Sequence, residues 1–252
     1  MIHLHLIGIG TGNPDHLTRQ ATRSLNAADL VLIPRKGADK ADLADLRRAI
    51  CAEVITNKAT QIAEFDLPTR DAANPDYVKG VDDWHDAIAM VWQTTIAAHP
   101  TARNVALLVW GDPSLYDSTL RIAARLEAQV TVVPGITALQ ALTAAHAIPL
   151  NDIGAAVTIT TGRQLTDHGW PSGVTTLAVM LDGNCAFQTL DPTGISIWWG
   201  AYVGMTEQII LSGPLAKIGD RIIATRAQAR SQHGWIMDIY LLRRGPYRRR
   251  YT

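Results

Sequence analysis

The stretch VALLVWGDPSLYDS, residues 105–118, predicts both a strand of the fold and a ligand site. Residues 105–110 are mostly apolar and uncharged, which predicts a buried strand, and the turn Gly111–Ser114 ends that strand. An apolar helical pattern follows from about Ser118. Small ligands bind beyond the carboxyl ends of strands in open α/β sheets. We therefore expect residues 110–116 to line a ligand site, although the spacing alone fits an ordinary β-to-α turn equally well.

The composition is that of a globular protein. The chain has 252 residues, of which 47% are hydrophobic and 18% are charged, so it is long enough for one large α/β domain or two smaller ones. No run approaches the roughly 18 apolar residues of a membrane span. The opening MIHLHLIGIG is too short for a secretory signal. We expect a cytoplasmic protein without a membrane partner.

The sequence offers little that indicates a metal. Cys51 and Cys185 are the only two cysteines and lie far apart, which is typical of neither a disulfide framework nor a zinc cluster. His3 and His5 alternate on one face of a predicted strand, where a solvated or hydrogen-bonded role is the common one. We expect no metal site.

The charges are balanced in number but not in position. The chain has 23 basic and 23 acidic residues, yet five arginines fall in the last ten residues: Arg243, Arg244, Arg248, Arg249 and Arg250. The rest of the chain therefore has 18 basic against 23 acidic residues. A basic tail without an accompanying aromatic and basic platform predicts a solvated terminus and no nucleic-acid partner.

The amino terminus predicts a strand over residues 2–7, a glycine turn over Gly8–Gly12, and a helix. That helix places four apolar residues on one face: Leu17, Ala21, Leu25 and Ala28. A dinucleotide fingerprint fails here, because Asn13 stands where its third glycine belongs and Asp29 begins the next strand instead of ending it. No Gly-Lys-Ser/Thr follows, so a phosphate-binding P-loop is absent too. What remains is a backbone turn that a ligand can approach closely.

Alternating strands and helices in the first half predict a parallel sheet. We expect strands at 29–33 and 130–133, helices at 40–50 and 76–98, and an irregular loop or lid at 56–75. A turn at 134–137 leads into an alanine-rich helix that runs to His146. Five strand patterns with less helix between them then predict a second domain with a mixed sheet: 155–161, 175–181, 195–203, 207–212 and 235–242. We place the domains at 1–133 and 134–252.

Four segments, taken together, resemble the tetrapyrrole (corrin and porphyrin) methyltransferase family. They are LIGIGTGNPDHLT (6–18), VWGDPSLYDS (109–118), VVPGITALQALTAA (132–145) and LAVMLDGN (177–184). The resemblance covers the whole chain and implies S-adenosylmethionine as methyl donor and S-adenosylhomocysteine as product. It also implies a homodimer of two-domain α/β chains, with a mostly parallel amino-terminal sheet, a mixed carboxyl-terminal sheet and the cofactor in the cleft between them.

Within the family, the runs Trp198–Tyr202 and Gly234–Asp238 are similar to the deacetylating branch of aerobic cobalamin synthesis. That similarity implies methylation of precorrin-5 at C1, with release of its acetyl group as acetate, to give precorrin-6A. Two departures limit the transfer of roles. Thr11 stands where the family usually has proline, and Pro34-Arg35 stands where some relatives have an aspartate base, so that base cannot be carried over.

The resemblance implies which residues bind the cofactor. Its methionine part and ribose would meet Thr11, Trp110, Gly111, Asp112 and Leu115, with Thr137 and Ala138 closing the second side. The adenine would meet Leu181, Tyr202, Val203 and Met237. A compact zwitterion joined to adenine needs backbone donors and acceptors at strand ends and apolar walls for the base, which agrees with this set.

The two halves of the implied reaction differ in what they demand. Methyl transfer needs mainly alignment in a dry site, whereas acetyl loss needs a base and an oxyanion donor. Asp182 is the candidate base, with Tyr116 or Tyr202 as donor, although we favour the alternative that Asp182 only shapes a turn. Arg35 and Arg163 are candidates for binding the substrate's carboxylates, although either fits an exposed surface arginine.

Four other interpretations stay open. The chain could be a precorrin methyltransferase acting at a different ring carbon, or an RNA methyltransferase of the same fold, which the basic tail weakly favours. It could be a nicotinamide-dependent oxidoreductase that uses Gly8–Gly12 as its phosphate turn, or a non-catalytic corrinoid-binding module. Saturable binding of NADPH but not of S-adenosylhomocysteine would favour the oxidoreductase.

Overall fold

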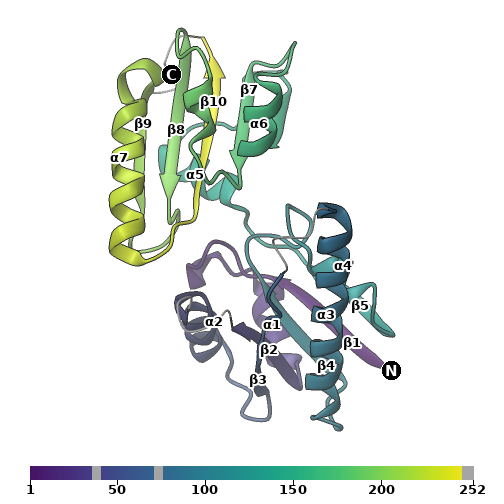
Figure 1. The fold of residues 1–252 in the computed structure, drawn as a ribbon. Coiled ribbons are helices and arrows are strands. Elements are labelled where there is room, and N and C mark those ends of the chain that lie inside the picture. Colours follow the sequence, from purple (N-terminus) through teal and green to yellow (C-terminus); the bar gives the residue numbers. More distant parts are fainter. Residues whose placement is uncertain (36–40, 71–75, 246–252) are drawn as a thin grey trace. The chain divides into compact units, whose positions relative to one another are not determined.

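The computed structural model describes residues 1–35, 41–70 and 76–245, and the chain forms two compact units (Figure 1). Unit 1 is Met1–Thr137 and unit 2 is Ala138–Thr252. The sequence-based boundary, between residues 133 and 134, lies in the turn that precedes this division. Each unit has its own sheet and its own core.

Unit 1 contains the predicted parallel sheet. Its five strands are β1 (Ile2–Gly8), β2 (Leu30–Arg35), β3 (Gln61–Asp66), β4 (Asn104–Val109) and β5 (Ala128–Val133). They lie in the order β3-β2-β4-β1-β5, and every pair is parallel. The central strands are buried on both faces, as parallel strands covered by helices are. The run 105–109 is therefore a core strand, as its uncharged sequence predicts.

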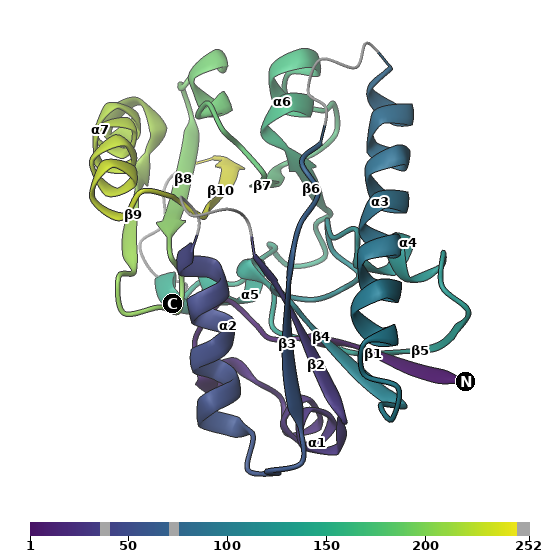
Figure 2. The ribbon, with the colours of Figure 1, turned by 60° about the horizontal axis from the view of Figure 1, so that its bottom comes forward.

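Helices cover both faces of this sheet. They are α1 (Arg19–Ala27), α2 (Ala41–Val54), α3 (Tyr77–Ala97) and the short α4 (Thr119–Ala123), with a 3₁₀ turn η1 (Pro14–His16) before α1. Ile7 and Ile33 pack with α1 and α2, whereas Leu4 and Leu32 pack with α3 and α4. Figure 2 shows α2 and α3 on opposite sides of the strands. The alternation of side chains along each strand thus builds two separate apolar layers.

Three sequence-based predictions for unit 1 need correction. Residues 56–75 are not all irregular, because they include the edge strand β3, of which only Phe65 is buried; residues 71–75 lie outside the described part. The apolar pattern after Ser118 includes Leu126 and so predicts a helix through that residue, but α4 ends at Ala123. The first helix starts at Arg19, since the Thr18 side chain accepts the Ala21 amide and caps it there.

Unit 2 contains the predicted mixed sheet. Its strands are β6 (Val157–Thr161), β7 (Thr176–Met180), β8 (Ile195–Ala201), β9 (Ile209–Pro214) and β10 (Asp238–Arg244). They lie in the order β6-β7-β10-β8-β9, where β6 and β7 are parallel and the other pairs antiparallel. Its helical segments are α5 (Ala138–His146), α6 (Gly162–His168), η3 (Ala186–Thr189) and α7 (Leu215–His233). The 19-residue α7 was not predicted, because charged and polar residues separate its buried Leu215, Ile222 and Ala229.

Two arginines of the basic carboxyl-terminal segment belong to the unit 2 sheet. Arg243 and Arg244 belong to β10, and Arg243 is 5% exposed and donates to the Pro149 carbonyl at 2.6 Å. Arg244 lies over the Trp170 ring at 4.6 Å. The expected solvated terminus is therefore wrong for Arg243, which is buried, whereas Arg244 is exposed at the end of β10. The other three lie outside the described residues.

Candidate functional site

Two turns meet at the carboxyl edge of the unit 1 sheet. The Gly111 amide donates to the Gly10 carbonyl at 2.7 Å, and the Gly10 amide donates to the Gly111 carbonyl at 3.3 Å. These turns follow β1 and β4, which are neighbours in the sheet and lead to helices on opposite faces. That arrangement is the topological switch point at which open α/β sheets bind ligands. The stretch 110–116 therefore lies where the sequence predicts a site.

A third turn, which follows β5, packs against the first two. A Cβ atom added to Gly135 would lie 2.1 Å from the Gly111 carbonyl oxygen. A Cβ on Gly8 would lie 2.6 Å from the Gly135 amide nitrogen. Only glycine permits backbones to pack this closely. The turn that ends at Thr137 is thus fixed beside the turn after β4.

The Asp112 carboxylate joins these turns. Its Oδ1 accepts the Ser114 amide at 2.8 Å, and its Oδ2 accepts the Gly135 amide at 2.9 Å. Burial alone would raise the pKa of Asp112, but the hydrogen bonds from Ser114 and Gly135 outweigh it and lower that pKa. Asp112 is consequently a loop-fixing anion in this structure, and its predicted contact with the cofactor stays a prediction.

Thr11 lies in the first turn, is 8% exposed and has a partner that the sequence did not indicate. Its Oγ1 is 3.0 Å from Nδ1 of His16 in η1. A Cβ on Gly10 would lie 2.6 Å from the Cβ of the same histidine. His16 thus packs against the glycine turn and orients the threonine. No motif at this spacing marks such a histidine, so only the structure finds it.

The aromatic residues of the turn after β4 differ in exposure. Trp110 is half-buried, and its indole Nε1 is buried without an acceptor within residues 1–35, 41–70 and 76–245. Tyr116 is 44% exposed and has a left-handed backbone, with φ of 51°. Burial raises the pKa of the Tyr116 phenol, so it stays protonated and able to donate. Leu115, in the same turn, is half-buried.

A second cluster of predicted residues lies at one edge of the unit 2 sheet. Leu181 follows β7, Tyr202 and Val203 follow β8, and Met237 precedes β10. The Tyr202 amide donates to the Met237 carbonyl at 2.9 Å. Leu181 is 66% exposed on a left-handed backbone, which is an unusual place for a leucine. This edge therefore presents an apolar side chain beside backbone polar groups.

Tyr202 contributes to this edge through its backbone only. Its ring is 1% exposed and packs edge-on against His233 and Trp235. Its hydroxyl donates to the Trp235 carbonyl at 2.5 Å. Tyr202 is therefore not available as the oxyanion donor that we considered from the sequence. Tyr116 remains the candidate for that role.

The Asp182 carboxylate points into unit 2. Its Oδ2 accepts the Ala186 amide and the Tyr240 hydroxyl, each at 2.6 Å, and its Oδ1 accepts the Asn184 amide at 2.9 Å. A Cβ on Gly162 would lie 2.4 Å from the Asp182 Cγ, so α6 covers the group closely. These bonds favour the turn-shaping alternative. The role of Asp182 as a base stays a prediction.

Arg226 on α7 links residues at the same edge of the unit 2 sheet through hydrogen bonds. Its guanidinium donates to both carboxylate oxygens of Asp238, at 2.9 and 3.2 Å, and to the Asp182 carbonyl at 3.0 Å. Trp199 Nε1 also donates to Asp238, at 3.0 Å. The strand-end residues are thus linked by one buried network. Sequence reasoning missed Arg226 because it lies in the helix that was not predicted.

The two arginines predicted to bind the substrate lie in different units. Arg35 ends β2, is exposed, and forms an ion pair with Asp66 at 2.9 Å and with Glu64 at 3.8 Å. Arg163 is exposed in the first turn of α6. Ala138, a predicted cofactor contact, begins α5 in unit 2, whereas Thr137 ends unit 1. These predicted residues are therefore divided between the two units.

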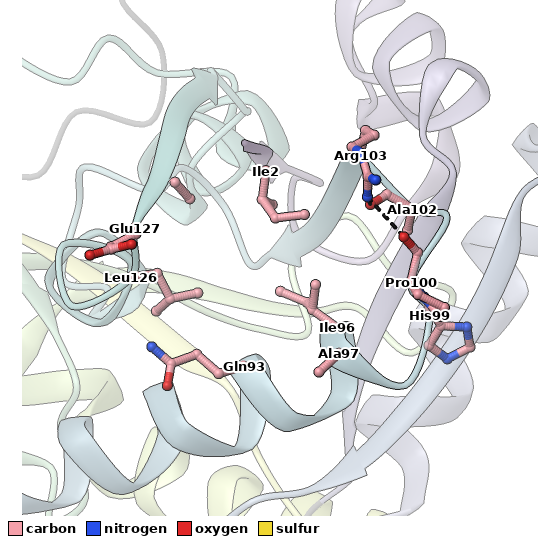
Figure 3. A pocket seen from close by; sticks show the side chains of 11 residues that line it. Ile2, Gln93, Ile96, Ala97, His99, Pro100, Ala102, Arg103, Leu126 and Glu127 are labelled. Atoms are coloured by element: carbon pink, nitrogen blue, oxygen red, sulfur yellow. Dashed lines mark hydrogen bonds between the residues drawn. The ribbon is translucent and has the colours of Figure 1, made fainter.

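A hollow of about 460 Å³ lies elsewhere in unit 1 (Figure 3). It is lined by Ile2 and Ala128, where β1 and β5 begin, and by the end of α3. Arg103 in its wall donates to the Pro100 carbonyl at 2.9 Å. The hollow is at the amino edge of the sheet, and none of the predicted site residues lines it. We assign the site to the carboxyl edge, where the topology and the predicted residues coincide.

Comparison with known proteins gives the family. The family model of the tetrapyrrole (corrin/porphyrin) methylases matches residues 3–219. The chain belongs to this family. A precorrin-6A synthase [deacetylating] from Sinorhizobium sp. is 49% identical to this methylase over 95% of this chain and 94% of its own. Membership argues against the nicotinamide-dependent oxidoreductase that the glycine turn left open.

Solved structures agree with the fold. A cobalamin-synthesis-related protein from Corynebacterium diphtheriae is 39% identical, with a TM-score of 0.82 over 97% of this chain and 99% of that chain. A uroporphyrin-III C-methyltransferase from Thermus thermophilus, solved with S-adenosylhomocysteine, is 19% identical, with a TM-score of 0.56 over 95% and 91%. At that identity, the second likeness shows the fold alone.

Two further properties concern the described residues only. Residues 1–35, 41–70 and 76–245 contain no helix with the length and apolar character that crossing a membrane requires. The same residues contain no group of three His, Cys, Asp or Glu side chains that could hold a metal ion.

Proposed function

We propose that this chain transfers a methyl group from S-adenosylmethionine to C1 of precorrin-5 and releases acetate, giving precorrin-6A. The observation that carries the proposal is the 49% identity, over 95% of the chain, to a precorrin-6A synthase [deacetylating]. The family membership supports a tetrapyrrole as substrate.

The two sheet edges suit the methyl donor. The unit 1 edge offers backbone groups in close-packed glycine turns and the indole Nε1 of Trp110, which has no acceptor among the described residues; both fit a polar zwitterion. The unit 2 edge offers the exposed Leu181, which fits the face of an adenine. S-adenosylmethionine supplies an activated methyl group on a sulfonium sulfur. The cleft that the resemblance implies for the cofactor stays a prediction.

For methyl transfer, we assign the chain a positioning role. Asp112 and Gly135 fix the turns after β4 and β5 to each other, so their backbone groups are oriented before any ligand binds. Such preorganisation lowers the entropic cost of aligning two reactants. In the proposal, Thr11, held by His16, borders the donor from the turn after β1.

Acetyl loss requires water to attack the acetyl carbonyl, and hence a proton acceptor and a donor to the developing oxyanion. Tyr116 is our candidate donor, because it is 44% exposed and its raised pKa keeps the phenol protonated. Asp182 remains the candidate base from the sequence. The three hydrogen bonds that its carboxylate accepts argue against this role.

The decisive experiment supplies the purified chain with S-adenosylmethionine and a precorrin-5-generating mixture. We expect S-adenosylhomocysteine, one equivalent of acetate, and a product with the mass of precorrin-6A. A methylated product that retains the acetyl group would instead support a precorrin methyltransferase acting at a different ring carbon. A mixture without S-adenosylmethionine is the control and is expected to release no acetate.

The proposal extends to a homodimer, which the family resemblance implies, and to a cytoplasmic location, which we expected from the sequence. Size-exclusion chromatography with light scattering measures the oligomeric state. We expect a mass twice the 27.4 kDa of the chain. A monomer mass at micromolar concentration would contradict it.

A further inference from the structure

Arg47 is a buried cation at the carboxyl edge of unit 1. It lies on α2 and is 9% exposed. Its Nε donates to the Leu108 carbonyl and its Nη1 to the Leu43 carbonyl, each at 3.2 Å. Its Cζ lies 5.0 Å from the centre of the Trp110 ring, so the guanidinium stacks on the first residue of the predicted ligand turn.

No carboxylate lies within ion-pair distance of this guanidinium in the described part of the chain. Asp117 acts on it electrostatically from farther away, and its Oδ1 accepts the Thr119 amide. Arg226 and Arg243 are also largely buried, yet each has an aspartate within 4.0 Å. Buried charges in proteins are normally paired. Within residues 1–35, 41–70 and 76–245, Arg47 therefore has no paired carboxylate, although its burial calls for one.

The strand pattern explains why Arg47 reaches this position. β2 and β4 pair only as far as Leu32 and Leu107. Beyond that point the Leu108 carbonyl has no partner on β2, and the Arg47 side chain takes it instead. The guanidinium therefore lies where the two strand ends separate, beside Trp110, whose buried Nε1 also lacks an acceptor among the described residues.

We propose that Arg47 and Trp110 form a binding site for a ligand carboxylate, with the guanidinium as its counter-charge. The proposal rests on the function proposed above, which supplies two carboxylate sources: the amino-acid end of the methyl donor and the acid side chains of the tetrapyrrole. A planar guanidinium is well matched to a carboxylate.

Arg47 keeps its charge under physiological conditions. Burial lowers the pKa of Arg47 to about 10, and the nearby Asp117 opposes that effect. The group is therefore protonated at neutral pH. Neither arginine chosen from the sequence is both buried and without an acid partner among the described residues. Arg35 pairs with acids, and Arg163 is exposed.

The test compares two donor analogues on purified Arg47→Met and Arg47→Lys chains by titration calorimetry. S-adenosylhomocysteine carries the amino-acid carboxylate, whereas 5′-methylthioadenosine lacks it. If the donor's carboxylate occupies the site, Arg47→Met raises the Kd of S-adenosylhomocysteine about tenfold or more and leaves that of methylthioadenosine unchanged. If a tetrapyrrole carboxylate occupies it, both Kd values stay unchanged and the KM for precorrin-5 rises by a similar factor. In either case we expect Arg47→Lys to raise the affected Kd or KM by a smaller factor than Arg47→Met does, because lysine keeps the positive charge.

A control variant and a second test variant make the outcomes decisive. Arg48→Met removes a neighbouring arginine that pairs with Glu64, and it is expected to change neither Kd nor KM. Trp110→Phe keeps an aromatic ring under the guanidinium and removes the N–H, so a weakening of several-fold is expected for the same ligand. This variant also tests the site if Arg47→Met fails to fold.

Three results would overturn the site. The first is unchanged Kd and KM in a folded Arg47→Met chain. The second is an equal loss of both adenosine ligands, which would mean that Arg47 merely positions Trp110. The third is a wild-type chain that does not bind S-adenosylhomocysteine, which would overturn the proposed function and the site with it. Failure in the variants alone leaves the proposed function standing.

Discussion

At the scale of single residues, the acids of the predicted site hold backbone in place. The carboxylates of Asp112 and Asp182 both accept main-chain amides, and Asp182 also accepts the Tyr240 hydroxyl. Beside Ser114 and Asn184, the side chains that these turns expose are the apolar Leu181 and the phenol of Tyr116, and neither turn exposes a charged group. Such a surface suits a ligand that brings its own reactive group, as a sulfonium methyl donor does.

Asp182→Asn separates the structural role from the role as a base. An amide oxygen cannot replace a carboxylate that accepts three hydrogen bonds, and bonds to charged groups contribute about 1.5–3 kcal/mol each. We expect urea unfolding to show a loss of about 1–3 kcal/mol, with acetate released per methyl transferred unchanged. The exposed Asp191→Asn is the control, because the backbone and side-chain hydrogen bonds that Asp191 accepts come from Thr193, two residues away in the same turn. Loss of acetate release at full stability would instead support the base.

Asp112 makes stability depend on pH in a defined direction. Its folded-state pKa lies below the ordinary 3.8, because hydrogen bonds from Ser114 and Gly135 outweigh burial. Its contribution is therefore complete above 3.8 and is lost as pH falls through the folded-state value. We expect Asp112→Asn to be less stable than wild type by about 1–2 kcal/mol at neutral pH and by progressively less in acid. A difference that grows in acid would contradict this assignment.

At the scale of elements, the sequence predicted those strands, turns and sheets that one clear local pattern marks. The uncharged run at β4, the glycine turn after β1 and the change to a mixed sheet are all confirmed. β3 was missed because an edge strand buries little, here only Phe65. The helix α7 was missed because its buried residues recur every seven positions among charged ones, a weaker signal than a full apolar stripe.

The close packing of three turns predicts that Gly135 tolerates no side chain. In Gly135→Ala, the new Cβ would lie 2.1 Å from the Gly111 carbonyl oxygen, so backbone must move. We expect a loss of about 3 kcal/mol or more in unfolding free energy, with S-adenosylhomocysteine binding lost too. Gly183→Ala is the stability control, because a Cβ there meets nothing within 4 Å. Equal stability of the two variants would refute the packing argument.

At the scale of the whole molecule, the resemblance supplied residues that no local pattern connects. Trp110 and Leu181 belong to different units, and neither periodicity nor spacing relates them. The residues that reasoning missed, such as His16, Arg47 and Arg226, come from helices and turns without a motif. Their roles depend on which strand ends lie together, and a single sequence does not specify that.

Hydrogen exchange tests whether both units bind the donor. Ligand at about 100 times its Kd stabilises the binding state by about 2.7 kcal/mol, which slows exchange of amides that open with the site. With S-adenosylhomocysteine, we expect slower exchange in residues 9–13 and 110–116 of unit 1 and in residues 181–186 and 202–204 of unit 2. The amides of α3 serve as an internal reference, because α3 contains none of the predicted contacts. Slowing confined to unit 1 would contradict the adenine contacts assigned to Leu181 and Met237, and slowing by NADPH instead would revive the oxidoreductase.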